Sequence, residues 1–515
     1  MTEILRERVI TSFGLTPDQR DAAIERNRDI VVTAGAGSGK TRTLVARYAS
    51  LLADGLSPRA VVAVTFTEKA AREMRSRVRQ ALTDLLKQAS TEEERQRWIA
   101  VNSEMDAARI GTIHSLCAEI LRAHPAEAEI DPKFDVLDEG LTAALRMNMI
   151  DETVTVLAGQ PEFSILFQNF DIASLKSLLG FLLEHRLEAQ ETFEKSFDSV
   201  QVVSRAIRDG MQHETIYGCI QELRSFSQPS LLQDAGDKLT QQVQELLALW
   251  SDAENALAQN DPIMCAGFLY KARREKMKGN IGSKTSRAKA IVADVQAAYD
   301  ECLNPIVGGK GANDPPPNRE SENRFLSLYP IIKAVFGLLA SAYQNALCQR
   351  RALDFDDLES GAARLLKIPE VRQHWQAEIG SLLVDEFQDT NERQRQIVEA
   401  LAGAPGRLFV VGDARQSIYR FRRTDVTVFR SIQQRVRIQG GLVIDLDQTY
   451  RAHEPLLQAT GDLLTTVMGT ADDTSRPYYV PFSPLHAVRK TDPEYISHPH
   501  IEFVLGTGED TAAAR

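Results

Sequence analysis

The amino-acid sequence predicts an α/β fold in which a parallel sheet carries helices and is interrupted by a long helical insertion. On either side of a central region, short apolar runs that are typical of buried strands alternate with segments of helical periodicity. Strand–loop–helix repetition of this kind indicates βαβ units and a parallel sheet. From about residue 126 to 349 the strand patterns fade and amphipathic helical patterns replace them.

The individual strands follow from apolar runs of four or five residues. After each of the first two runs, apolar residues recur at helical spacing, across 44–52 and 74–85, which predicts a helix there. Several runs end in polar residues, and ligands in open α/β sheets bind at the carboxyl ends of strands. The predicted strands lie at 29–33, 60–64, 381–384, 407–411 and 442–444.

Length, charge and cysteine usage restrict the class of protein. The 515 residues suggest about three or four domains at roughly 100–200 residues each. A net charge of −11 argues against general coating of nucleic acid or of an anionic membrane, although a local basic groove stays compatible with it. The five cysteines form no C-x-x-C pair, which excludes the usual zinc and disulfide frameworks. With a charged N-terminus and no uninterrupted apolar run of about 18 residues, we expect a cytoplasmic protein without a membrane role.

A glycine-rich loop between the first predicted strand and its helix has the pattern of a phosphate-binding Walker A loop. Backbone N–H groups of such a loop surround phosphate oxygens, the lysine adds a positive charge, and the hydroxyl is a ligand for Mg²⁺. The alternative is a glycine-rich surface turn, which the strand–helix context disfavours. The residues of the loop are Ala34, Gly35, Ala36, Gly37, Ser38, Gly39, Lys40 and Thr41.

Two acidic residues after the strand at 381–384 are the natural partners of this loop. We expect Asp385 to hold Mg²⁺ together with Thr41, and Glu386 to orient or deprotonate the water that attacks ATP. Acids after a strand are often only a solvated turn, but the phosphate loop favours the functional interpretation. The predicted cofactors are therefore ATP and Mg²⁺.

Eight short motifs follow one another along the chain, at 15–19, 34–41, 65–71, 111–115, 354–358, 385–390, 412–422 and 448–451. In this order they resemble the motifs of superfamily 1A DNA helicases of the UvrD/Rep type, and the AddA/RecB branch of helicase–nuclease subunits most of all. The resemblance covers residues 13–125 and 350–455 well and the insertion loosely. It implies a RecA-like motor domain.

The resemblance implies roles for residues around ATP. Gln19 would contact the adenine edge, and Arg42 and Tyr450 would enclose the adenine ring. Gln416 would sense the γ-phosphate, and Arg451 would reach it from a second RecA-like domain, as an arginine finger does.

The resemblance also implies contacts with DNA. Phe66 and Phe421 would stack on bases, which stabilises binding by roughly 1–3 kcal/mol per base without sequence preference. Without the resemblance, both would be interpreted as core aromatics. The same motifs assign Lys69, Thr112, His114 and Arg422 to DNA binding.

A basic stretch in the insertion, residues 271–289, has two open interpretations. In the first interpretation the stretch contacts the phosphates of DNA, and in the second it is a solvated basic helix and loop.

We expect a RecA-like domain 1A at 1–125 and 350–440, a helical domain 1B at 126–349, and an incomplete domain 2A at 441–515. Motifs V and VI of the family are not found, so we expect a truncated chain. The predicted function is an ATP-dependent DNA helicase with 3′ to 5′ movement on single-stranded and forked DNA in recombination and repair, completed by a further polypeptide or a missing C-terminal half. The alternatives are a nucleotide- or DNA-binding module without unwinding activity and a P-loop NTPase that acts on a small molecule.

Overall fold

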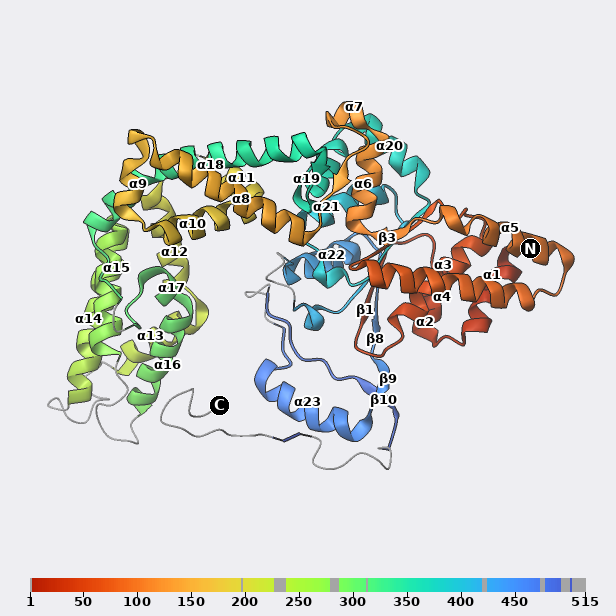
Figure 1. Cartoon of the computed structure of the whole chain (residues 1–515). Helices are drawn as coiled ribbons and strands as arrows, with labels where there is room; N and C mark the ends of the chain where they lie inside the picture. Colours follow the sequence, from red (N-terminus) through yellow and green to blue (C-terminus); the bar gives the residue numbers. More distant parts are fainter. Residues whose placement is uncertain are drawn as a thin grey trace. The chain divides into compact units, whose positions relative to one another are not determined.

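The computed structural model describes residues 2–195, 198–226, 238–277, 287–311, 314–418, 424–472, 478–491 and 501–502. Contacts divide the chain into two units, Met1–Asp138 with Arg350–Arg515, and Glu139–Gln349. Figure 1 traces both units along the chain. Phe421 and Arg422, both predicted to bind DNA, lie outside the described residues.

The first unit contains a six-stranded sheet in which every pairing is parallel, in the order β3-β2-β6-β7-β1-β8. This confirms the predicted α/β fold. The strand β3 follows a loop at residues 108–109 and is only three residues long, too short for its hydrophobic pattern to reveal it. The strands are β1 (Ile30–Ala34), β2 (Val61–Thr65), β3 (Ile110–Thr112), β6 (Ser381–Val384), β7 (Leu408–Gly412) and β8 (Leu442–Leu446).

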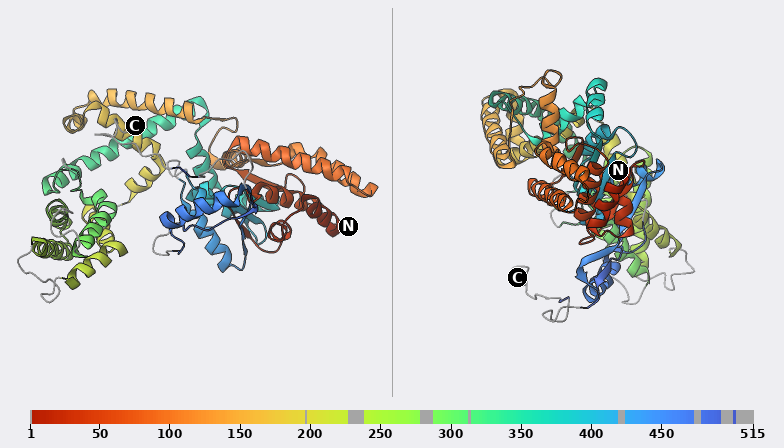
Figure 2. Two further views of the ribbon diagram at one scale, coloured as in Figure 1. Left: turned by 90° about the horizontal axis from the view of Figure 1, so that it is seen from below. Right: turned by 90° about the vertical axis from the view of Figure 1, so that its right-hand side faces the viewer.

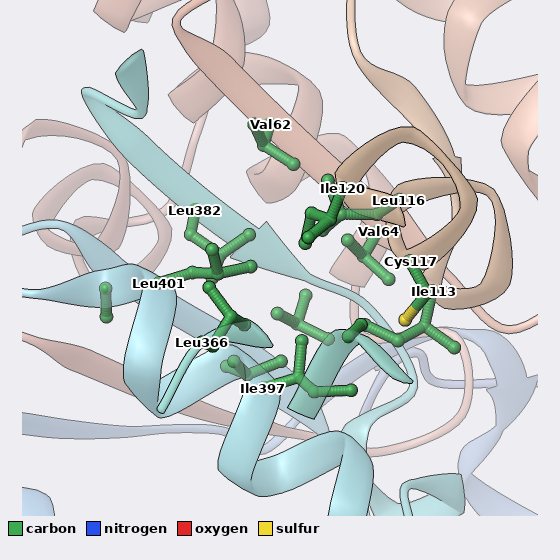
Figure 3. Packing of buried hydrophobic residues seen from close by; sticks show 14 of the residues in the cluster. Val62, Val64, Ile113, Leu116, Cys117, Ile120, Leu366, Leu382, Ile397 and Leu401 are labelled. Atoms are coloured by element: carbon green, nitrogen blue, oxygen red, sulfur yellow. The ribbon is translucent and has the colours of Figure 1, made fainter. Parts of the chain in front are cut away.

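Helices cover both faces of this sheet because its strands are apolar on both sides. On one face, Val62 and Leu382 pack against side chains of a first group of helices (Figure 3). On the other face, Val32 and Phe409 pack against a second group. The first group is α6 (Ile113–Ala123), α19 (Phe355–Leu365), α20 (Pro369–Glu378), α21 (Glu392–Ala402) and α22 (Val426–Ile438). The second group is α1 (Thr2–Phe13), α3 (Lys40–Ala53), α4 (Glu68–Lys87) and α5 (Glu92–Ser103).

Smaller elements complete the first unit. A pair of parallel strands, β9 and β10, lies beside α23 after the main sheet. These elements are α2 (Pro17–Ile24), η1 (Met105–Ala107), α7 (Pro125–Ala128), β4 (Asp135–Val136), β5 (Ala352–Leu353), η4 (Phe387–Asp389), η5 (Ala414–Gln416), β9 (Gln448–His453), α23 (Glu454–Met468) and β10 (His486–Arg489).

Two predicted domain boundaries need correction. We expected residues 441–515 to begin a second domain, but β8 hydrogen-bonds to β1 and is therefore part of the first sheet. We expected the insertion to begin at 126, but β4 pairs with β5, which keeps residues up to 138 with the first unit. Phe134 is also buried in the core of that unit.

The second unit is entirely helical in its described residues, which is consistent with the pattern expected for the insertion (Figure 2, yellow through green). Trp250, Tyr299 and Leu246 are at the centre of its main core. Its elements are α8 (Glu139–Ala158), η2 (Pro161–Phe163), α9 (Ser164–Asn169), α10 (Ile172–Glu184), α11 (Arg186–Glu194), α12 (Ser199–Met211), α13 (Glu214–Phe226), α14 (Lys238–Ala258), α15 (Pro262–Lys271), the π-helical η3 (Ala272–Lys276), α16 (Arg287–Cys302), α17 (Asn304–Val307) and α18 (Arg319–Arg350).

The basic stretch of this unit is partly used for internal ion pairs. Arg273 is buried and donates from Nε to Oδ1 of Asp300 over 2.6 Å. The hydrogen bonds from Arg273 hold the pKa of the Asp300 carboxyl below its ordinary value, against the effect of burial. Lys276 pairs with Glu245. At these two positions the positive charge has a structural partner, which favours the structural interpretation for this part of the stretch.

Among the described helices, α18 is long and apolar enough to cross a membrane by length and composition, and η2–α9 with α10 forms a bent pair that passes the same test. We expected no such segment. Core helices of soluble proteins also meet these criteria, and 28% of the apolar window of α18 is buried.

Candidate active site

The predicted phosphate loop connects β1 to α3 at the carboxyl edge of the sheet. Its two central glycines have left-handed backbone angles, with φ of 76° at Gly37 and 89° at Gly39. A Cβ atom at Gly37 would lie 2.5 Å from the Cβ of Arg451, and one at Gly39 would lie 2.6 Å from the side chain of Gln19. Both the backbone angle and the lack of space therefore require glycine at these positions. Ala34 ends β1, and Ser38 closes the loop by donating its hydroxyl to the carbonyl of Gly35 over 2.8 Å.

The structure brings Lys40, Glu386 and Gln416 together from three separate parts of the sequence. Nζ of Lys40 donates to Oε2 of Glu386 over 2.9 Å and to Oε1 of Gln416 over 3.3 Å. Glu386 has φ of 51°, a left-handed conformation that costs a non-glycine residue of the order of 1–3 kcal/mol. The chain turns sharply after β6 at this residue, and the carboxylate reaches the lysine of the phosphate loop. The convergence of these side chains was not visible in the sequence spacing.

Gln388 is a residue of this site to which the sequence analysis gave no role. Its Nε2 donates to Oε2 of Glu386 over 2.9 Å, and its Oε1 accepts from the backbone N–H of Asp413 over 2.9 Å. The side chain is 1% exposed. Gln388 thereby joins the acidic turn after β6 to the turn after β7. Gln416 is fixed from the same second turn, because its Nε2 donates to Oδ2 of Asp413 over 2.9 Å.

The acidic residues after β6 are in an environment that resists negative charge. Burial raises the pKa of Asp385 to about 6, and the neighbouring Glu386 carboxylate adds to this effect. Burial and Glu386 likewise raise the pKa of Asp389 to about 6, and Oδ1 of Asp389 has no hydrogen-bond partner. A cation beside these carboxylates would favour their ionised form.

The donors near the phosphate loop fit Mg²⁺. Thr41 offers a hydroxyl and Asp385 a carboxylate, which are the hard oxygen ligands that this ion prefers. No group of three or more His, Cys, Asp or Glu side chains among the described residues could hold a metal by itself. Mg²⁺ commonly takes only one or two protein ligands, with phosphates and water as the others.

The strand β9 lies directly against the phosphate loop. The backbone N–H of Tyr450 donates to the carbonyl of Gly37 over 3.0 Å, and the hydroxyl of Thr449 donates to the carbonyl of Ala36 over 2.8 Å. The backbone of Tyr450 and the side chain of Arg451 therefore lie beside the loop, and their contact with ATP stays a prediction. Arg451 is exposed.

Gln19 and Arg42, which were assigned to adenine, have other contacts here. Nε2 of Gln19 donates to the carbonyl of Ser38 over 3.0 Å, and its Oε1 accepts from the N–H of Thr16 over 3.1 Å. Gln19 is buried and forms a capping box with Thr16 at the start of α2. Arg42 donates to the carbonyl of Phe13. Contact of either side chain with adenine stays a prediction.

The described residues predicted to bind DNA follow the neighbouring strands β2 and β3. Phe66 is half-buried and Lys69 is exposed at the start of α4. Thr112 caps α6 and donates its hydroxyl to Oε1 of Glu68 over 3.0 Å. His114, in the first turn of α6, stacks on Phe355 with ring centroids 4.3 Å apart. Because all six strands are parallel, these residues and the phosphate loop share one edge of the sheet.

Comparison with known proteins agrees with this geometry. The family model of the UvrD/REP helicase N-terminal domain matches residues 15–292 and 330–437. The chain is 27% identical over 464 residues to an ATP-dependent helicase/nuclease subunit, AddA, of Ligilactobacillus salivarius, covering 81% of this chain and 36% of that protein. Proteins of the same name from Syntrophomonas wolfei and Listeria welshimeri are 26% and 28% identical, over 90% and 88% of this chain and 39% of each relative.

The chain thus spans about two fifths of the length of these relatives. The resemblance to UvrD/Rep-type helicases and to the AddA branch is confirmed. Since the family model matches more than half of the residues, the chain belongs to the UvrD/REP helicase family, through its N-terminal domain.

Proposed function

We propose that this chain forms the ATP-binding motor of an ATP-dependent DNA helicase that acts in recombination and repair and moves 3′ to 5′ on single-stranded DNA. The observation that carries the proposal is the convergence of Lys40, Glu386 and Gln416 at the sheet edge that also presents Phe66 and His114. A motor must link loss of the γ-phosphate to its grip on DNA, and here both sets of residues follow strands of one rigid sheet.

The contacts around Lys40 suggest how ATP enters the cycle. In the present arrangement Lys40 neutralises Glu386. When ATP binds, its β- and γ-phosphates compete for the Lys40 ammonium group, and Glu386 becomes available to accept a proton from the attacking water. Gln416 contacts Lys40 directly, so it is placed to respond to the presence of the γ-phosphate.

Magnesium fits this arrangement through Thr41 and Asp385. Bound there, Mg²⁺ would neutralise charge on the phosphates of ATP. Gln388 orients Glu386 from the other side by its hydrogen bond to Oε2.

The substrates and partners follow from the family and from the names of the relatives. We propose single-stranded and forked DNA as substrates, with Phe66, Lys69, Thr112, His114, Phe421 and Arg422 as the contacting residues. The relatives are named as subunits of a helicase/nuclease, so we propose that another polypeptide or a further region supplies the remaining part of the ATP cleft, and that Arg451 then reaches the γ-phosphate.

The ATPase rate of the purified chain with and without single-stranded DNA tests the proposal. Because part of the ATP cleft is proposed to come from outside this chain, we expect slow turnover, which DNA stimulates and Lys40→Ala abolishes. Turnover that DNA leaves unchanged would favour a small-molecule NTPase, and nucleotide binding without turnover would favour a non-enzymatic module. We expect no unwinding by the chain alone, and robust unwinding by it would contradict the proposal of an incomplete ATP cleft. Unwinding of forked DNA with a single 3′ or a single 5′ tail, once the missing part is supplied, then tests the direction of movement.

A further inference from the structure

A buried carboxylate lies between the DNA-facing and the ATP-facing parts of the sheet edge. Glu359, on α19, is 4% exposed, and none of the motif roles above includes it. Its Oε1 accepts from Nε2 of His114 over 3.0 Å and from Nε2 of Gln394 over 2.6 Å. Its Oε2 accepts from Nδ2 of Asn391 over 3.0 Å. The side chain is therefore the common acceptor of three hydrogen bonds, and its Oε2 also forms an ion pair with Nη1 of Arg393 on α21 at 3.9 Å.

These donors come from two different segments of the chain. His114 is in the first turn of α6, the helix that directly follows β3, and Thr112 is the N-cap of that helix. Asn391 and Gln394 begin α21, which follows the turn that carries Asp385 and Glu386. Asn391 is the N-cap of that helix and Gln394 is its partner in a capping box. A single carboxylate thus joins the helix on the DNA side to the end of the acidic turn on the ATP side.

The orientation of the His114 ring depends on this carboxylate. The ionised Glu359 only accepts hydrogen bonds, so Nε2 of His114 must carry the proton. The ring lies nearly parallel to Phe355, at an interplanar angle of 21°, and its side chain keeps 26% of its surface exposed. A change in the ring that DNA causes would reach Glu359 through this hydrogen bond and through the stacking on Phe355 of the same helix, while both oxygens of the carboxylate are held by α21.

Burial opposes ionisation of Glu359, but the hydrogen bonds from His114, Asn391 and Gln394 outweigh it and hold the pKa of the carboxyl below its ordinary value. An apolar side chain at this position would pack beside the buried Leu358 and Ala362 without any of these partners. A buried ionic cluster of this kind is often no more stabilising than apolar packing, so stability alone is a weak reason for its presence.

We propose that Glu359 is a positioning residue that couples DNA binding at α6 to the acidic turn of the ATP site. DNA that engages Thr112 and His114 shifts the first turn of α6. Glu359 transmits this shift to Asn391 and the start of α21, and thereby to Glu386 at the beginning of the same turn. This inference rests on the proposed function and adds a residue that regulates its ATP site.

The test compares the ratio of DNA-stimulated to basal ATPase rate among variants. Glu359→Gln places an amide opposite three donors, and we expect the ratio to fall about fivefold or more while the KM for ATP stays the same. Glu378→Gln is the matched control, since Glu378 is an ion-paired glutamate on the neighbouring helix α20 and should keep the wild-type ratio.

Two further variants separate coupling from folding. Asn391→Ser keeps a good N-cap for α21 but removes the amide donor, so it should lower the ratio at little cost in stability. Glu359→Gln with Gln394→Glu returns a carboxylate to the cluster and keeps the capping box, so it should restore the ratio.

The outcomes are distinguishable. A wild-type chain that DNA does not stimulate overturns the proposed function and this inference together. A stimulated wild-type chain whose Glu359→Gln and Asn391→Ser variants keep the full ratio overturns the inference alone. The same holds if these variants lower basal and stimulated rates in proportion, because that pattern is expected of a purely structural role.

Discussion

Replacing Asp385 by asparagine should stabilise the ligand-free protein at alkaline pH, although it removes a predicted magnesium ligand. Asp385 follows β6 and has Glu386 as its neighbour. Burial and the Glu386 carboxylate raise its pKa from the ordinary 3.8 to about 6, with Lys40 opposing the effect. Asparagine has nearly the same shape and cannot ionise, so the substitution removes this electrostatic cost.

The sign and size of the effect follow from the pKa. Because the folded-state pKa lies above the unfolded-state value, Asp385 favours the folded state more when it is protonated than when it is ionised. The contribution of the protonated form is fully present below pH 3.8 and is lost as the pH rises through about 6. Above that pH the ionised side chain costs about 3 kcal/mol at 1.36 kcal/mol per pKa unit. Asp385 is half-buried, so solvent screening makes this an upper bound. Asp385→Asn should gain up to about 3 kcal/mol near pH 8 and close to nothing near pH 4.

The assay is chemical unfolding of both proteins across this pH range without nucleotide. Glu359→Gln provides a control of opposite sign. Hydrogen bonds hold the pKa of Glu359 below its ordinary value, so its contribution is present at neutral pH and is lost as the pH falls through the lowered pKa. That variant should therefore be destabilised near pH 8. A variant Asp385→Asn that is no more stable than wild type near pH 8, or whose gain does not change with pH, would refute the reasoning. Magnesium with a non-hydrolysable ATP analogue should stabilise wild type more than Asp385→Asn.

Three other substitutions, two of them with a matched control variant, have outcomes that local geometry determines. Gly37→Ala should weaken ATP binding at least about tenfold in calorimetry, because its Cβ would clash with the strand that covers the phosphate loop. Gly440→Ala has nearly the same φ, 75°, with nothing within 4 Å, so it should cost only about 1 kcal/mol of stability and leave binding unchanged. Gln388→Met should lower kcat for ATP about tenfold at unchanged KM, because it releases Glu386, the proposed acceptor of the proton from water; equal kcat values would contradict this role. Asp300→Asn should destabilise the helical unit by about 3 kcal/mol, since it leaves a buried arginine unpaired. Glu245→Gln removes an exposed carboxylate and should destabilise the unit much less, and equal losses in thermal unfolding would contradict the distinction.

The sequence alone determined the fold class and most of the strand positions. Apolar runs identified β1, β2, β6, β7 and β8 to within one or two residues, because strands that are buried on both faces are apolar throughout. The phosphate loop was evident from local pattern as well, since its glycines meet a requirement of the backbone itself. The order of the motifs identified the family before any three-dimensional information.

The tertiary structure decided which distant residues meet. Glu386, Gln388 and Gln416 come together only because β6 and β7 are neighbours in the sheet, and no periodicity of the sequence encodes that neighbourhood. The same sheet order placed β8 beside β1 and moved the expected domain boundary. Glu359 was invisible in the sequence because a single glutamate in an amphipathic helix is normally solvated. Its role becomes apparent only when His114 and α21 are seen to converge on it, since a buried charge is stabilised by donors that the fold, and not the local sequence, brings into reach.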